Sequence, residues 1–425
     1  MSDDRVFVKC AWHLLPLITA AYVVNYLDRV NVGFAALTMN GDLGFSPSVF
    51  GFGSGILFIG YSLSQTPANY MLTRVGVRRW VFCIMLCWGA LSACCAFATG
   101  PASFYVLRFL LGVAEAGLLP AMIFYLSDWF PSECRGRYIA AFQASIPMSF
   151  VIGGPISSAL LQLNGVLGLH GWQWLFVMEG LPAVLLAFAV LLLLPDDPSS
   201  SRWLNEAEKR TVLMALSTES TSATSAYWPV LRDARVLVLG VILFAFAGGQ
   251  AAYLLWLPQV VAGMGFSAFT TGWVVAAIFG LFIPSMILWG RHSDTTGERI
   301  WHVAISAMLS AFGFATAAAA HDSTLALLAL TCAGLGLFLF CGPFLSLPSL
   351  LLRGPALACG IALLNSIGTF GGFVAPLTVG VLKQQTGSYA APFTVVALVM
   401  LGCAAVTLTF GRLITVRAAN ALAAE

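Results

Sequence analysis

Charged side chains are scarce in this chain. Asp, Glu, Lys and Arg make up 9% of its 425 residues, whereas 59% are hydrophobic. A soluble globular protein carries about 25% charged residues, so this composition excludes an ordinary soluble domain. The short alternating segments of an outer-membrane barrel are missing as well. The chain is therefore expected to be a helical membrane protein that crosses the bilayer many times.

Patterns for metal, cofactor or catalytic chemistry are also missing. The ten cysteines fall mostly in apolar stretches, and none forms a zinc-type spacing with histidine. Neither a cofactor-binding loop nor a nucleophile beside a base is visible. The sequence thus predicts no metal site, no cofactor, no nucleic-acid partner and no enzymatic activity.

Long apolar stretches occupy most of the chain, and we count twelve. Each approaches the roughly 20 residues that a membrane-spanning helix needs. They are residues 11–37, 49–71, 79–98, 102–128, 137–163, 172–194, 236–262, 269–291, 300–320, 323–349, 355–384 and 390–414. Prolines inside them, such as Pro120, Pro147 and Pro343, allow bends. The predicted fold class is all-α and polytopic, with twelve transmembrane helices.

The distribution of positive charge predicts an orientation. Of the 20 Lys and Arg, seventeen fall in the N-terminus, the even-to-odd connections and the C-terminus, and only Lys383 falls on the opposite side. The positive-inside rule then places both termini in the cytoplasm. The start of the chain leads straight into the first span with no cleavable signal evident. We expect a multi-pass protein of the cytoplasmic, or inner, cell membrane.

An internal repeat divides the chain. The triplet Gly-Phe-Ser at 44–46 recurs at 265–267, an offset of 221 residues. At the same offset Gly51, Gly76, Arg78 and Trp80 match Gly272, Gly297, Arg299 and Trp301. Two six-helix halves of the same orientation explain these matches, and transporters built this way bind substrate near the midplane between halves. Chance similarity among Gly-rich helices is the alternative. The expected division is 1–194, a cytoplasmic linker 195–235, and 236–425.

The expected linker carries its own local signals. Asn205 and Glu208 have the spacing of a capping box, which predicts a short surface helix. The run 217–226 is rich in Ser, Thr and Ala and is expected to be flexible. No chemistry is predicted in this segment.

Four charged residues fall inside the predicted spans: Asp28, Arg29, Arg108 and Glu115. A charge near the bilayer centre costs roughly 2.5–3.5 kcal/mol, and such residues usually face a cavity or one another. Arg108 and Glu115 are two helical turns apart and so share a face, about 10 Å apart along the axis. Asp28 and Arg29 are neighbours and must point about 100° apart.

These residue types suit the transport of an acid with protons. The planar fork of arginine holds both oxygens of a carboxylate and stays charged when dry. Burial favours a protonated carboxyl, whereas a nearby arginine favours an ionised one. A substrate anion that occupies the arginine would make the carboxyl take a proton more readily, and linkage makes this coupling reciprocal. The alternative is that Asp28–Arg108 or Arg29–Glu115 are fixed ion pairs that join two helices.

Three strings carry a family resemblance. The first span contains NYLDRVN at 25–31, the fourth contains RFLLGVAEAG at 108–117, and WFP follows at 129–131. These strings resemble the anion:cation symporter family of the major facilitator superfamily, and above all its tartrate-transporter-like members. Bacterial members import organic acids such as tartrate and galactonate. The resemblance implies that Arg29 binds the substrate carboxylate and that Asp28 and Glu115 handle protons.

The loop signature of this superfamily, Gly-x-x-x-Asp-Arg-x-Gly-x-Arg-Arg, occurs twice in imperfect form. The matching residues are Arg74, Gly76 and Arg78 in the first copy and Asp294, Gly297 and Arg299 in the second. The resemblance implies that these loops help to hold one of the alternating conformations. Thr73 replaces the acid of the first copy, which puts a latch in the first half in doubt.

The remaining candidates are polar rather than charged. Substrate binding is predicted for Tyr26, Tyr61 and Gln143 in the first half, and for Gln250, Tyr253, Asn365, Ser366 and Thr369 in the second. For most of them a helix–helix hydrogen bond is an equal alternative. Glu179, about two turns into the sixth span, is expected to reach only the membrane interface.

The combined prediction is a proton-coupled symporter that imports a small organic acid anion by alternating access. The substrate would be a hydroxy or sugar acid, such as tartrate or an aldonate, or an aromatic carboxylate. The expected partners are this carboxylate, protons and membrane lipid, and the protein is expected to be a monomer. One alternative is a sodium-coupled or exchange carrier for another anion such as phosphate. A second is a sensor that binds an organic acid without transporting it.

Overall fold

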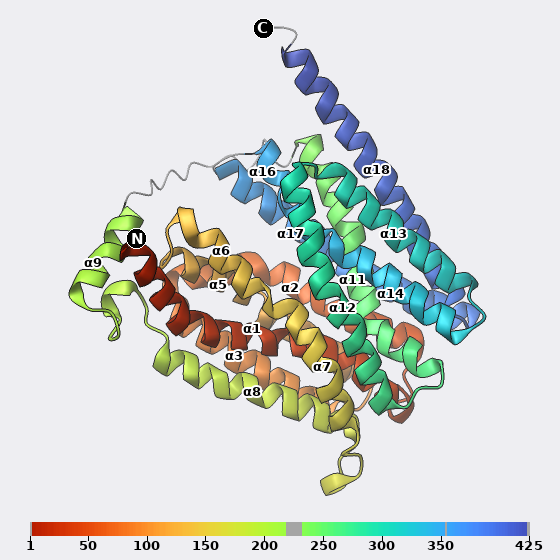
Figure 1. The fold of residues 1–425 in the computed structure, drawn as a ribbon. Helices are drawn as coiled ribbons and strands as arrows, with labels where there is room; N and C mark the ends of the chain where they lie inside the picture. Colours follow the sequence, from red (N-terminus) through yellow and green to blue (C-terminus); the bar gives the residue numbers. More distant parts are fainter. Residues whose placement is uncertain (1, 218–231, 353–354, 423–425) are drawn as a thin grey trace. The chain divides into compact units, whose positions relative to one another are not determined.

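Helices make up every regular element of the described chain. The computed structural model describes residues 2–217, 232–352 and 355–422, and the long elements among them are helices (Figure 1). The first six spans are α1 (Ser2–Asp42), α2 (Pro47–Val75), α3 (Val77–Cys94), α4 and α5 (Pro101–Glu115, Leu118–Ser127), α6 and α7 (Ser132–Gln143, Ser145–Leu161), and α8 (Gly171–Leu193).

The last six spans follow a short surface helix, α9 (Glu206–Ser217). They are α11 (Ala234–Gly263), α12 (Ala268–Thr296), α13 (Ile300–Ala319), α14 to α16 (Ser323–Leu339, Cys341–Leu345, Leu347–Leu351), α17 (Pro355–Thr386) and α18 (Ala390–Leu422). Each of the twelve predicted stretches is helical, so the all-α, twelve-helix prediction is confirmed.

Eleven helical segments among the described residues are long and apolar enough to cross a membrane. The remaining span, α2, has 29 residues. Its second half carries Gln65, Asn69 and Arg74, which makes it less apolar than the others. Length alone therefore identifies α2 as a membrane-crossing helix.

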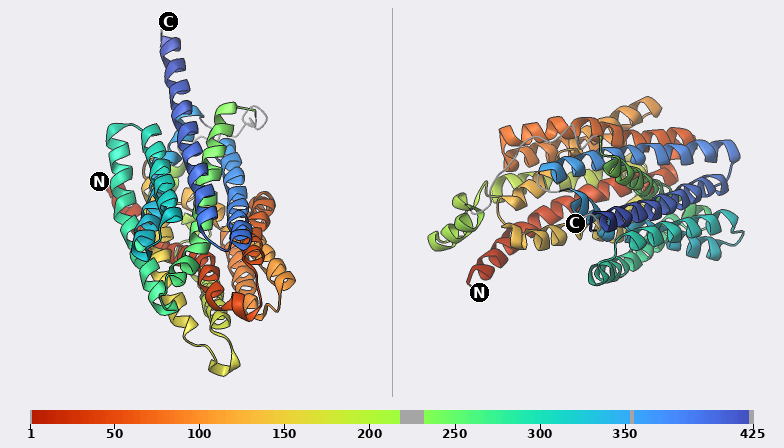
Figure 2. Two further views of the ribbon diagram at one scale, coloured as in Figure 1. Left: turned by 90° about the vertical axis from the view of Figure 1, so that its right-hand side faces the viewer. Right: turned by 90° about the horizontal axis from the view of Figure 1, so that it is seen from above.

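Two compact units divide the chain. Unit 1 consists of residues 1–43, 59–221 and 268–276, and unit 2 consists of residues 44–58, 222–267 and 277–425. In unit 1, α1 packs against α7 and α8, and α3 packs against α8. In unit 2, α11 packs against α17, and α13 packs against α14 and α18, which further views also show (Figure 2). The division into halves at 194 and 236 stays a prediction.

Two glycines that the repeat pairs allow close helix approach. A Cβ at Gly272 of α12 would lie 2.4 Å from the carbonyl oxygen of Gly154 in α7, within unit 1. A Cβ at Gly51 of α2 would lie 2.6 Å from the carbonyl oxygen of Pro376 in α17, within unit 2. Any larger residue would force these backbones apart. The repeated glycines therefore serve the same packing purpose in each unit.

Three predicted spans are interrupted in the structure. The fourth breaks after Glu115, the fifth at Ala144 and the tenth at Phe340 and Ser346. Pro147 and Pro343 stand four residues after the last residues of α6 and α14, where the proline ring clashes with a carbonyl and supplies no N–H. The sequence analysis expected bends but drew continuous spans. The breaks leave Glu115 and Gln143 as the last residues of α4 and α6.

The predicted capping box before α9 is confirmed. The Glu208 N–H donates to Asn205 Oδ1 and the Asn205 N–H donates to Glu208 Oε2, each at 2.8 Å. Lys9 Nζ of α1 also donates to both Glu208 oxygens, at 3.0 and 2.8 Å. The helix is thus tied to α1. Of the run expected to be flexible, residues 218–226 lie outside the described residues.

Candidate functional site

An ion pair joins α1 to the end of α4 inside unit 1. Arg29 donates from Nε and Nη2 to Glu115 Oε2, at 3.0 and 2.9 Å. The Glu115 side chain is fully buried, whereas the Arg29 side chain is 21% exposed. The Arg29 side chain is thus both paired and partly exposed. Two of the four charged residues singled out by the sequence therefore meet directly.

Two tyrosine rings complete the surroundings of Arg29. Its guanidinium carbon lies 5.1 Å from the ring centroid of Tyr26 and 5.2 Å from that of Tyr61. A cation within about 6 Å of an aromatic face is attracted by the ring quadrupole. We call Arg29, Glu115, Tyr26 and Tyr61 the Arg29 cluster. It combines a cation that can bind an anion with apolar ring faces beside it.

Asp28 points away from this cluster, as expected for neighbours on a helix. It is 1% exposed, and its Oδ1 accepts hydrogen bonds from Asn31 Nδ2, at 2.9 Å, and from the Ser92 hydroxyl. Its Oδ2 has no hydrogen-bond partner within the described residues. Asp28 is therefore a deeply buried acid held mainly by neutral donors.

Arg108 of α4 is the cation whose charge influences Asp28 most. It is 2% exposed, and Phe104, Leu111 and Glu115 share its buried face of the helix, as the seven-residue spacing predicts. Its charge acts on the Asp28 carboxylate. Its Nε and Nη1 have no hydrogen-bond partner in the described parts of the chain. Arg108 is therefore a buried cation, in contrast to the partly exposed Arg29.

The sequence analysis did not anticipate that Glu179 is buried among helices of unit 1. This residue of α8 is 4% exposed, and Ser157 Oγ of α7 donates to its Oε1 at 2.7 Å. The side chain is covered because α1 and α3 pack against α8 and α7 packs beside it. Asn31 was also missed, although its position three residues after Asp28 places both on one helical face. We call Asp28, Asn31, Ser92, Ser157 and Glu179 the Asp28 network.

The first copy of the loop signature lies between α2 and α3. Gly76 has a φ of 83°, which a glycine adopts without strain. Arg78 Nη2 lies 2.7 Å from Asp196 Oδ2, just after α8, while Arg74 stacks on Tyr70. Thr73, which replaces the expected acid, donates to a backbone carbonyl instead. The acid for this loop therefore comes from Asp196, which the sequence analysis did not identify.

The second copy lies between α12 and α13. Gly297 has a φ of 67°, matching Gly76 at the repeat offset. Arg299 Nη2 lies 2.7 Å from Asp294 Oδ1, and its Nη1 donates to Ser293 Oγ at 2.8 Å. The two loops thus share a glycine turn and an arginine–aspartate pair. Their role in holding a conformation stays a prediction.

The predicted polar residues of the second half lie in unit 2 and mostly bond to backbone. Gln250 donates to the Leu337 carbonyl at 2.7 Å, beside the break between α14 and α15. Tyr253 is 4% exposed and donates to the Leu330 carbonyl at 3.1 Å. On α17, Ser366 and Thr369 donate to the carbonyls of the residues four positions earlier, and the Asn365 side chain is exposed. Substrate roles for these residues, and for Gln143 in unit 1, stay predictions.

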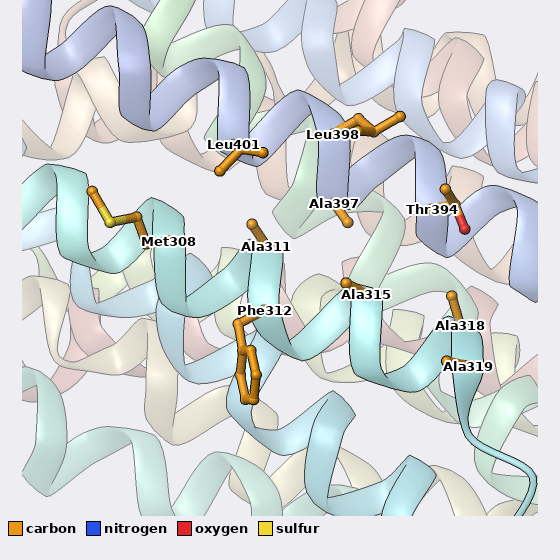
Figure 3. Close-up of a pocket in the computed structure, with 10 residues that line it drawn as sticks. All are labelled: Met308, Ala311, Phe312, Ala315, Ala318, Ala319, Thr394, Ala397, Leu398 and Leu401. Carbon is orange, nitrogen blue, oxygen red and sulfur yellow. The ribbon is translucent and has the colours of Figure 1, made fainter.

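A hollow between α13 and α18 has the wrong chemistry for an anion. It has a volume of about 550 Å³ and is lined by Met308, Phe312, Leu398, Leu401 and several alanines, with the Thr394 hydroxyl at one end (Figure 3). No charged group lines it. Among the described residues, no group of three or more His, Cys, Asp or Glu could hold a metal ion. The Arg29 cluster therefore remains the best candidate site.

Comparison with known proteins identifies the family. The family model described as Major Facilitator Superfamily matches residues 18–376. The chain belongs to the Major Facilitator Superfamily. It is 44% identical over 414 residues to a protein of Agrobacterium vitis named "Putative tartrate transporter", with 96% of this chain and 92% of that one covered. The resemblance to tartrate-transporter-like members is thereby confirmed.

Other similar proteins of this superfamily widen the range of named activities. A protein of Acinetobacter baumannii named "Quinolone resistance transporter" is 37% identical over 404 residues, with 94% of this chain and 93% of that one covered. The crystal structure of a D-xylose–proton symporter has a TM-score of 0.76 at 16% identity, and covers 94% of this chain and 97% of its own. The structural likeness supports the fold alone. These relatives are named as transporters rather than enzymes, and the chain is a multi-pass membrane protein.

Proposed function

We propose that this protein imports a small organic acid anion together with protons, by alternating access. The observation that carries the proposal is the pairing of a partly exposed Arg29 with a fully buried Glu115. A carboxylate substrate and the Glu115 carboxylate compete for the same guanidinium. Since both bind the same fork, the arrival of one changes the state of the other.

Proton uptake follows from this competition. When a substrate carboxylate takes the Arg29 fork, Glu115 loses the cation that compensates its buried charge. An ionised carboxylate left in a dry site is costly, so Glu115 takes up a proton. By linkage, a proton on Glu115 frees Arg29 and strengthens substrate binding by the same factor. This reciprocity is the coupling that a symporter requires.

The membrane potential explains why the import of an anion benefits from a coupled proton. Moving one anion into a negative interior costs about 2.3 kcal/mol per 100 mV, and one co-transported proton cancels this for a monoanion. A dianion requires a second proton, for which Asp28 is the second acid. Arg108 would then compensate Asp28 between turnovers rather than contact substrate directly.

The proposed substrate is a hydroxy acid, a sugar acid or an aromatic carboxylate. The names of relatives support an organic anion such as tartrate, and the ring faces of Tyr26 and Tyr61 offer apolar contacts beside the guanidinium. Gln143 and the polar residues of unit 2 are proposed to recognise the hydroxyl groups. The quinolone-related name of one relative means that similarity alone does not specify the acid.

The proposed setting is the inner membrane, with both termini in the cytoplasm and the protein acting as a monomer. The bias of Lys and Arg toward the even-to-odd connections supports this orientation. The loops with the Arg78–Asp196 and Arg299–Asp294 pairs would then lie on the cytoplasmic side. We propose that these two loops hold one of the transport conformations.

Uptake into liposomes containing the purified protein tests the proposal. Labelled tartrate and a panel of aldonates and aromatic acids would be supplied without sodium, under an imposed gradient that is acid outside. We expect accumulation of at least one of these acids, abolished by a protonophore. Accumulation that requires sodium, or that requires a counter-anion inside, would instead identify one of the alternative carriers. Binding with no uptake under any gradient would identify a sensor.

A further inference from the structure

The buried charges of unit 1 do not balance. Asp28, Glu115 and Glu179 are buried carboxyls, and Arg29 and Arg108 are the guanidiniums beside them. If all five were ionised, one negative charge would be left without compensation away from water. A buried charge without a partner is strongly disfavoured, so one of the three acids must hold a proton.

The contacts separate the three acids. Glu115 is bonded directly to Arg29, and Asp28 receives two hydrogen bonds and lies within the field of Arg108. Glu179 receives a hydrogen bond from the Ser157 hydroxyl, and no cation is bonded to it within the described residues. The groups that face Glu179 from α1 and α7 are Asp28, Asn31 and Ser157, and the Asp28 charge repels it.

Two unsatisfied acceptors indicate where the proton lies. Glu179 Oε2 and Asn31 Oδ1 are both buried, and neither has a hydrogen-bond partner in the part of the chain that the structure describes. The Asn31 side chain is close enough to the Glu179 carboxyl to influence its protonation. An unprotonated Glu179 can only accept, whereas a protonated one carries an O–H donor. A proton on Oε2 would let Glu179 donate to Asn31 Oδ1 and satisfy both atoms.

We propose that Glu179 holds a proton throughout the transport cycle and, through Asn31, positions Asp28. The Glu179 O–H fixes the Asn31 amide, whose Nδ2 donates to Asp28 Oδ1 at 2.9 Å. With Glu179 neutral, the remaining carboxyls and guanidiniums balance two against two. Glu179 is thus a positioning residue, and the exchanged protons belong to Glu115 and Asp28. This last assignment rests on the proposed function, whereas the proton on Glu179 does not.

Infrared spectroscopy of the purified protein tests the held proton without any transport. We expect the carbonyl band of a protonated carboxylic acid at neutral and mildly alkaline pH in the wild type, lost in Glu179→Gln. Glu206→Gln, which changes an exposed acid of α9, should keep the band. Ser157→Ala should shift the band to higher frequency without removing it, because Oε1 loses its hydrogen bond. A spectrum that Glu179→Gln leaves unchanged would overturn the proposal.

Transport tests the positioning role. Glu179→Gln keeps the shape and retains a donor toward Asn31, whereas Glu179→Leu removes both polar groups. We expect the pH profile of uptake to be shifted in the leucine variant. In the glutamine variant we expect the wild-type profile. If Glu179→Gln loses accumulation driven by a pH gradient but keeps exchange, the Glu179 proton moves during transport and the proposal is wrong. If the wild type shows no proton-driven uptake, the proposed function fails, and the infrared result still decides the state of Glu179.

Discussion

At the scale of single residues, the proposed roles of Arg29 and Asp28 rest on the different surroundings of these two neighbouring side chains. Arg29 is partly exposed and bonded to an acid, whereas Asp28 is almost completely buried and bonded to an amide and a hydroxyl. Adjacent helix positions point about 100° apart, so a single pair of residues serves two separate environments. Our proposal therefore gives substrate contact to Arg29 and a proton-binding role to Asp28.

Arg29→Lys tests the need for a planar fork. Lysine keeps the positive charge but cannot donate from two fixed nitrogens to one carboxylate. We expect the KM for the substrate to rise about tenfold or more, equal to about 1.4 kcal/mol of binding free energy. Arg79→Lys, an exposed change in the first turn of α3, serves as the matched control and should keep the wild-type KM. A lysine variant with an unchanged KM would remove Arg29 as the substrate anchor.

Sequence reasoning found the residues of the Arg29 cluster because charge inside an apolar stretch is a strong signal. Arg29 and Glu115 stand out in spans where few residues are charged, and helical spacing predicted the shared face of Arg108 and Glu115. It missed the burial of Glu179, since that burial depends on three neighbouring helices rather than on the position of the residue along its own helix. The contacts of Ser92 and Ser157 could not be predicted from the sequence, because small residues such as serine are common where membrane helices pack.

At the scale of elements, the twelve spans were predictable and their interruptions were not. Apolar length marks a span, but continuity depends on whether neighbouring groups satisfy the backbone around each proline. Gln250 shows the difference, since its amide bonds to the Leu337 carbonyl beside the break between α14 and α15. That contact joins segments 87 residues apart, so no local pattern could have predicted it.

The attachment of α9 gives a prediction about pH. The hydrogen bond from Lys9, and next the Asn205 N–H, hold the pKa of Glu208 below its ordinary value. A lowered pKa in the folded state means that the contact is complete above the ordinary value and is lost as pH falls through the lowered one. We expect hydrogen exchange in α9 to increase over that acid range in the wild type, relative to Glu208→Gln measured at the same pH.

Glu208→Gln keeps the capping box and removes the charge that Lys9 binds. Its α9 should therefore exchange faster than that of the wild type at neutral pH. Glu206→Gln is the matched control, because its ion pair with Lys209 stays within α9 and does not reach α1. Equal exchange in all three proteins would mean that the Lys9 contact does not hold α9 in place.

At the scale of the whole molecule, the two sequence repeats have diverged in chemistry while keeping their packing. Gly51 and Gly272 still allow close helix approach, and Gly76 and Gly297 still form left-handed turns. Yet Asp28, Arg29 and Glu115 correspond at the repeat offset to Gly249, Gln250 and Gly336. The charged residues inside the spans are therefore concentrated in the first repeat, and the proposed coupling between proton and substrate belongs to that repeat.

This concentration predicts how the transport cycle fails when one acid is neutralised. Glu115→Gln mimics the protonated carboxyl permanently and leaves Arg29 free to bind substrate. Exchange of labelled for unlabelled substrate needs no net proton movement, so it should persist in this variant. Accumulation driven by a pH gradient requires Glu115 to gain and lose a proton, so it should fall to the level reached without a gradient. Glu206→Gln should keep both activities, and a Glu115→Gln protein that still accumulates substrate would show that another acid, with Asp28 the first to examine, carries the coupled proton.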